Sequence, residues 1–155
     1  MALKNTFLIA AVMLATTTLA SAQTVSAAYP ESIAAALLKN GYRADVTTDS
    51  DGDPMIESAA SGWNYRIMFY GCENNRACQD VMFSAGFDMD DGMSMDSVNS
   101  WNQNKLVGRV YLDDETDPYI VHFVAGMDGM TGPAFERLMQ RWEAALGEFT
   151  DYIGW

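Results

Sequence analysis

The stretch WNYRIMFYGCENNRACQDVMFSAGF, residues 63–87, decides the fold class, because it has the pattern of two strands joined by a short loop. Apolar side chains recur at every second position in both halves, at Tyr65, Ile67 and Phe69, then at Val81, Phe83, Ala85 and Phe87. A period of two is typical of a strand that buries one face. Since a short connection favours antiparallel pairing, residues 63–72 and 80–87 are predicted to form a hairpin.

The loop of this hairpin holds the two cysteines of the chain, Cys72 and Cys78. In an oxidising compartment a close pair usually forms a disulfide, so we expect these two residues to be bonded to each other. The closed loop is short, and its contribution to stability would be modest, about 2 kcal/mol. The spacing is not that of a C-x-x-C redox motif. Zinc would need four ligands, and His122 is the single histidine.

Residues 1–22 have the pattern of a secretory signal peptide. Lys4 gives a positive start, residues 7–15 are apolar, and Ala-Ser-Ala at 20–22 suits cleavage before Gln23, with a cut after residue 27 or 28 as the alternative. The apolar run is shorter than the roughly 20 residues that span a bilayer. We therefore predict a periplasmic or secreted domain, residues 23–155, with no membrane insertion after cleavage.

The charge of this domain excludes some partners. Lys4 is the one charged residue of the signal, so residues 23–155 hold eight basic and 21 acidic side chains and a formal net charge of −13. Such a surface repels phosphate backbones and anionic lipid, so nucleic-acid binding is disfavoured. The 133 residues make one domain of ordinary size.

The other expected elements surround the central hairpin. Helices are predicted at 30–40, 94–106 and from Pro133 onward, and strands at 42–48, 55–60, 108–113 and 119–125. The middle helix has Ser94 as its expected N-cap, and its buried candidates are Val98, Trp101 and Leu106. Short turns favour antiparallel strands, and helices must bury their apolar stripes against a sheet. The prediction is an α+β fold, an antiparallel meandering sheet with helices packed on one face.

The acidic stretch DSDGD, residues 49–53, resembles the start of a calcium-binding EF-hand loop. Asp49, Asp51 and Asp53 fit the first ligand positions of such a loop. Pro54 then stands where the loop needs glycine, and Ala60 stands where it needs a chelating glutamate. Asp-Gly between two strand patterns instead predicts a hairpin turn, with weak divalent binding as the alternative.

Methionine offers a second candidate for metal binding. Met89, Met93 and Met95 are closely spaced, and thioethers suit Cu(I) in an exported protein. No histidine or cysteine lies beside them, and methionine is commonly an adaptable core residue. The core interpretation is preferred, and no cofactor is predicted.

A longer motif occupies SVNSWNQNKLVGRVYLDDETDPYIVHF, residues 97–123. Its characteristic positions are Trp101, Asn102, Lys105, Gly108, Arg109, Tyr111 and Asp113. With GYRADVTTDSDGDPMIES at 41–58 and FYGC at 69–72, the chain resembles the exported branch of the YbjN-domain family. The resemblance implies a fold similar to type III secretion chaperones and a regulatory role in sensory transduction or stress responses. It implies no catalytic residues, and the chain departs from the family at Thr116, where glycine is common.

The prediction of function begins with the catalytic residues. No serine has a matching histidine and aspartate context, so the chain is predicted not to be an enzyme. The preferred interpretation is an exported, non-catalytic domain that binds a protein or peptide and is chaperone-like or regulatory. The alternative is an extracytoplasmic metal-binding module that uses the methionines or acidic turns.

The predicted partner surface follows from strand alternation. If Ile67, Phe83 and Leu112 face the helices, the opposite face holds Arg66, Met68, Tyr70, Arg109 and Tyr111. His122 joins this face if Val121 and Phe123 point inward. Tyrosine, methionine and arginine are enriched at protein interfaces, although such side chains also simply cover an open face. The partner would be a client protein or peptide, or a second copy of the chain.

Overall fold

The computed structural model describes residues 24–155, and the predicted signal peptide, residues 1–22, lies outside them. The helices are α1 (Pro30–Lys39), α2 (Met95–Asn104) and α3 (Gly132–Ile153). The strands are β1 (Asp45–Thr48), β2 (Pro54–Ala60), β3 (Trp63–Tyr70), β4 (Asp80–Gly86), β5 (Arg109–Leu112) and β6 (Pro118–Val124). The predicted α+β class and the predicted order of elements are confirmed.

The six strands form one antiparallel sheet in the order β1-β2-β3-β4-β6-β5. It meanders from β1 to β4, and then the chain crosses through α2 to the far edge. There β5 forms the edge, and β6 returns between β5 and β4. Because β6 is antiparallel to both neighbours, β4 and β5 run parallel and need the helical crossover that α2 supplies.

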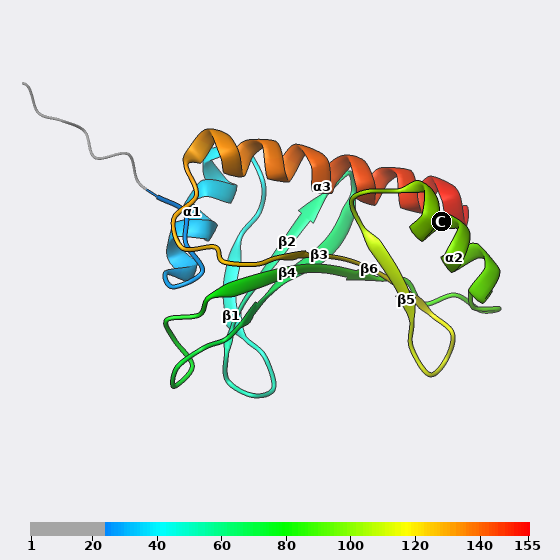
Figure 1. Ribbon diagram of the computed structural model, residues 1–155, viewed down its shortest axis with the longest axis horizontal. Helices are drawn as coiled ribbons and strands as arrows, with labels where there is room; N and C mark the ends of the chain where they lie inside the picture. Colours follow the sequence, from blue (N-terminus) through cyan, green and yellow to red (C-terminus); the bar gives the residue numbers. More distant parts are fainter. Residues whose placement is uncertain (1–23) are drawn as a thin grey trace, which may run out of the picture.

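The helices cover one face of the sheet. Figure 1 shows α3 lying lengthwise over the strands, with α1 near one end and α2 near the other. Side chains from all three helices and from the inner sheet face form one buried core. At its centre the Trp142 ring of α3 packs on Tyr65 and Phe83, with ring centroids 5.6 Å apart in each case. We call this covered side the inner face and the other side the open face.

Three predicted boundaries were wrong by two or more residues. The strand predicted at 63–72 ends at Tyr70. The strand expected at 42–48 begins only at Asp45, because Tyr42 turns toward α3 and its hydroxyl donates to Glu143 Oε2 at 2.7 Å. The helix expected to reach residue 106 ends at Asn104, and the chain becomes extended at Lys105. Leu106 then points fully into solvent, so its predicted burial was wrong.

Other local predictions are confirmed. Ser94 caps α2, and its hydroxyl accepts from the Ser97 N–H at 3.2 Å. Val98 and Trp101 are buried, as the helix pattern predicted. Among the described residues, no helix combines the length and apolarity needed to cross a membrane.

Candidate functional site: the open face of the sheet

The open face has no helix over it (Figure 1), and strand register places methionine, aromatic and arginine side chains on it. Strand register places five of the six predicted partner-binding residues there: Arg66, Met68, Tyr70, Arg109 and Tyr111. Among the further residues that the same register places there, four were not part of the predicted surface and extend its apolar part: Met55, Met82, Tyr119 and Phe123.

Three methionines lie side by side on adjacent strands. Met55 is the direct cross-strand partner of Met68, and Met68 is the partner of Met82. Phe123 on β6 pairs with Met82 and extends the line. We call Met55, Met68 and Met82 the methionine row. Sequence reasoning missed it because its members are far apart along the chain and meet only through strand register.

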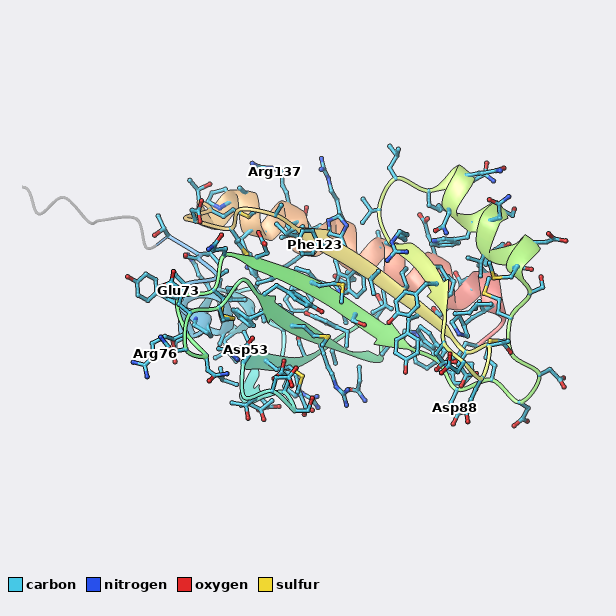
Figure 2. All side chains as sticks on the ribbon, turned by 60° about the horizontal axis from the view of Figure 1, so that its bottom comes forward. Asp53, Glu73, Arg76, Asp88, Phe123 and Arg137 are labelled. Atoms are coloured by element: carbon cyan, nitrogen blue, oxygen red, sulfur yellow. A yellow bond between two sulfur atoms is a disulfide. The ribbon has the colours of Figure 1, made fainter. Side chains whose placement is uncertain are left out.

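Aromatic side chains continue this apolar strip. The Tyr70 hydroxyl lies 3.8 Å from Met68 Sδ, and the Tyr70 ring meets Phe123 edge-on with centroids 6.2 Å apart. The methionines are half-buried by one another and their neighbours, whereas Phe123 is 52% exposed and is labelled on the sheet in Figure 2. Burial raises the pKa of Tyr70, with further contributions from Tyr111 and Asp49, so this hydroxyl stays a neutral hydrogen-bonding group.

The far end of the face combines arginine and tyrosine. The Tyr111 and Tyr119 rings stack with centroids 5.3 Å apart and planes 15° from parallel. The Arg109 guanidinium lies over the Tyr111 ring at 5.7 Å, within cation–π range. Burial and the neighbouring Tyr119 raise the pKa of Tyr111. This end can therefore offer flat aromatic surface together with positive charge.

A depression of about 400 Å³ opens beside Tyr119. Gly86 leaves the bottom of this depression open because it has no side chain. A Cβ at this position would lie 2.5 Å from the Tyr119 ring. The polar side chains around the depression include basic, acidic and neutral residues: Arg43, Glu57, Asn64, Arg66, Ser84, Asp88 and Asp117. The volume lies in the range of sites that accept a small ligand or a large side chain.

The prediction for His122 was wrong. His122 is the cross-strand partner of Phe83, so it points to the inner face, whereas Val121 and Phe123 point to the open face. The side chain is about half-buried, and this burial lowers its pKa. The alternation of residues 119–124 could not decide the matter, because apolar side chains occupy both faces of β6.

The acidic stretch of residues 49–53 is a hairpin turn, as predicted. Asp49 Oδ1 accepts from the N–H groups of Asp51 and Asp53, both at 2.9 Å. Asp53 Oδ1 accepts instead from Asn75 Nδ2 at 2.9 Å. These carboxylates are therefore engaged in shaping the turn, and no group of three acidic, histidine or cysteine side chains in residues 24–155 is arranged to hold a metal ion.

A second acidic turn at residues 113–117 repeats this geometry at the other end of the strands. Asp113 Oδ1 accepts from the N–H groups of Glu115 and Asp117, both at 3.0 Å. Its fourth residue is Thr116 at φ +67°, where the first turn has Gly52 at φ +88°. Figure 1 shows both turns projecting on the side of the sheet away from α3. Acidic turns therefore frame the open face at both strand ends.

The predicted disulfide is present, since Cys72 and Cys78 are bonded to each other. The loop that it closes sits beside the first acidic turn. Asn75 within this loop donates to the Asp51 carbonyl at 3.1 Å as well as to Asp53. The disulfide loop thus holds the turn at this end of the open face.

Three residues of the family motif pack the end of α2 against the far edge of the sheet and α3. Trp101 Nε1 donates to the Gly108 carbonyl at 2.6 Å, and Lys105 covers the Trp101 ring at 5.1 Å while pairing with Glu148 at 2.7 Å. Gly108 is at φ +80°, and a Cβ there would meet Ile120 at 2.6 Å. At these three positions of the motif, packing and backbone geometry account for the residue type.

Asn102 performs a separate task at the edge strand β5. Its Oδ1 accepts from the Val110 N–H at 2.8 Å, and its Nδ2 donates to the Val110 carbonyl at 3.0 Å. An edge strand presents unpaired backbone groups that can recruit another strand. One amide side chain thus occupies both backbone groups of Val110 and blocks pairing there.

The methionines singled out from the sequence do not form a common surface. Met93 is buried in the core, and Met89 packs partly against it. Met95 is 69% exposed at the start of α2. The preferred interpretation of core packing fits Met93 and Met89.

A comparison with protein-family models identifies the family of the chain. Residues 29–155 match the model of the YbjN family, whose description is "Putative bacterial sensory transduction regulator". Because the match covers most of the chain, the chain belongs to the YbjN family. A comparison with curated proteins gives no match. The likeness to type III secretion chaperones stays a prediction.

Proposed function

We propose that the protein is an exported, non-catalytic regulatory domain that binds a segment of a client protein on its open face. The observation that carries this proposal is Phe123, which is 52% exposed beside the methionine row on a sheet face without a covering helix. Contiguous exposed apolar side chains with a polar rim are typical of interaction surfaces. Methionine suits such a role because its flexible thioether adapts to different partners.

The charge of the chain indicates which charge the client segment should carry. The acidic turns at both strand ends surround an apolar floor, and the exported domain has a net charge of −13. The seven carboxylates of the two turns outnumber Arg66 and Arg109 on the open face, so charge complementarity favours a segment with an apolar centre and basic flanks and steers it during encounter. A second copy of this acidic chain would meet repulsion instead. The depression beside Tyr119 has room for one anchoring side chain of the client.

Export is supported by two independent features. Residues 1–22 have a signal-peptide pattern, and the Cys72–Cys78 disulfide is a bond that persists in oxidising compartments. The family description supports a regulatory role. Together they favour a domain that acts outside the cytoplasm by binding.

Fluorescence anisotropy with labelled peptides tests the proposal. Two peptides share a Leu/Met-rich centre, one with Lys/Arg flanks and one with Asp/Glu flanks. The protein should bind the basic peptide, and added salt should weaken binding. Phe123→Ser should abolish binding, whereas Leu106→Ser, which changes an exposed apolar residue outside the open face, should not. Equal binding of both peptides, or equal effects of both variants, would contradict the proposal.

A further inference from the structure

The methionine row has a chemistry beyond apolar contact. Its three thioethers come from three adjacent strands, β2, β3 and β4, and Met68 is the direct partner of both others. Directly opposed residues in an antiparallel pair have Cβ atoms about 5 Å apart. The outer two backbones are two strand spacings apart, about 10 Å. Methionine side chains have three rotatable bonds and can converge over Met68 from both sides.

The two cysteines and the histidine of the chain do not join this row. Cys72 and Cys78 are bonded to each other, and His122 points to the inner face. Within residues 24–155, no cluster of acidic, histidine or cysteine side chains competes for a hard or borderline ion. A set made only of thioethers selects Cu(I) over Zn²⁺, Ca²⁺ or Mg²⁺.

We propose that Met55, Met68 and Met82 form a Cu(I) site on the open face, with Met68 as the central ligand. Phe123 lies next in the same cross-strand line, so its ring flanks the site. The Tyr70 hydroxyl, 3.8 Å from Met68 Sδ, is a weak partner that the metal would replace. The site differs from the methionine cluster at residues 89–95, which the fold divides between core and solvent.

Anaerobic competition with the chromophoric chelator bicinchoninate measures Cu(I) binding by the purified protein. We expect one equivalent to bind, and Met68→Leu to weaken the affinity at least tenfold, because leucine keeps the apolar volume and removes the sulfur. Met55→Leu and Met82→Leu should weaken it as well. Met95→Leu is the matched control and should leave the affinity unchanged.

A second measurement needs no variant of the site. Titration of Ag(I), a redox-inert analogue of Cu(I), should shift the methyl resonances of three methionines in the wild-type spectrum, assigned as residues 55, 68 and 82. Shifts of residues 89, 93 and 95 instead, or no Cu(I) taken from bicinchoninate, would overturn the proposal.

Two variants distinguish the Cu(I) proposal from the proposed binding of a client peptide. Phe123→Ser should remove peptide binding and keep Cu(I) binding, because its change leaves all three sulfurs in place. Met68→Leu should weaken Cu(I) binding at least tenfold and keep peptide binding, because an apolar surface remains. Loss of both functions in both variants would show that the two sites are not distinct and would contradict the thioether assignment.

Discussion

Replacing Asn102 with alanine should release the edge strand β5. The wild-type amide makes two hydrogen bonds to Val110, of 2.8 and 3.0 Å, and Val110 itself is almost fully buried. The substitution leaves the Val110 N–H and carbonyl without a protein partner. Both groups then face either water or another strand.

The size of the effect follows from these two bonds. A hydrogen bond contributes about 1 kcal/mol net, so Asn102→Ala should lower the free energy of unfolding by about 2 kcal/mol. Asn104→Ala is the matched control in the same helix, because the Asn104 side chain is exposed and bonds only the Ser100 carbonyl of its own helix. An exposed change of this kind usually stays within about 0.5 kcal/mol.

Urea unfolding followed by far-UV circular dichroism, with the disulfide intact, measures the difference. With a slope of about 2 kcal/mol per molar urea, Asn102→Ala should shift the midpoint down by about 1 M. Asn102→Asp should also be destabilised, since a carboxylate accepts from the Val110 N–H and cannot donate to its carbonyl. Size-exclusion chromatography should show self-association of Asn102→Ala through the opened edge. Equal midpoints for the two alanine variants would refute this reasoning.

Three further predictions concern single side chains. Trp101→Phe should destabilise more than Trp142→Phe by about 2 kcal/mol in urea unfolding, because Trp101 Nε1 donates to Gly108 while Trp142 Nε1, although buried, has no acceptor within residues 24–155. Thr116→Gly should raise the free energy of unfolding by about 0.5 to 1 kcal/mol, since a β-branched residue at φ +67° is strained. His122→Leu should make stability less dependent on pH between 7.5 and 5.5, measured by the same assay. Burial lowers the pKa of His122 below the ordinary 6.5, so the unfolded chain binds the proton more readily and the wild type loses stability as the pH falls.

Each of these predictions has its own control. A Trp142→Phe cost equal to that of Trp101→Phe would show that the indole hydrogen bond does not matter. Gly52→Thr places threonine at the same position of the other acidic turn, and it should destabilise as Thr116→Gly stabilises. If His122→Leu follows the wild-type pH curve, the buried imidazole is not the titrating group.

The sequence predicted those features that depend on one element at a time. The period of two in residues 63–70 and 80–86 and the apolar stripe of α3 specify buried faces by themselves, and both are confirmed. Strand β6 could not be oriented, because Val121, His122 and Phe123 give no clear alternation. The orientation of β6 follows from the pairing of His122 with Phe83 on β4. This pairing is a contact between two strands, which the sequence of β6 alone does not show.

Contacts between elements also explain why the methionine row was not predicted from the sequence. Spacing along the chain drew attention to residues 89, 93 and 95, which are close in sequence and diverge in space. Met55, Met68 and Met82 are 13 and 14 residues apart and align only when the registers of two hairpins are known. The family motif was recognised from sequence, but the role of Asn102 at an edge strand depended on the crossover through α2.

In-cell photo-crosslinking tests the binding role of the open face most directly. A photoreactive amino acid is placed in turn at Phe123 and Tyr111 on the open face, and at Leu106 and Leu38 as exposed apolar positions elsewhere. The crosslinked species are identified by mass spectrometry. Positions 123 and 111 should capture the same client, through a segment with an apolar centre and basic flanks, and positions 106 and 38 should not. Capture of that client from positions 106 and 38, with none from 123 and 111, would contradict the assignment of the open face as the binding surface.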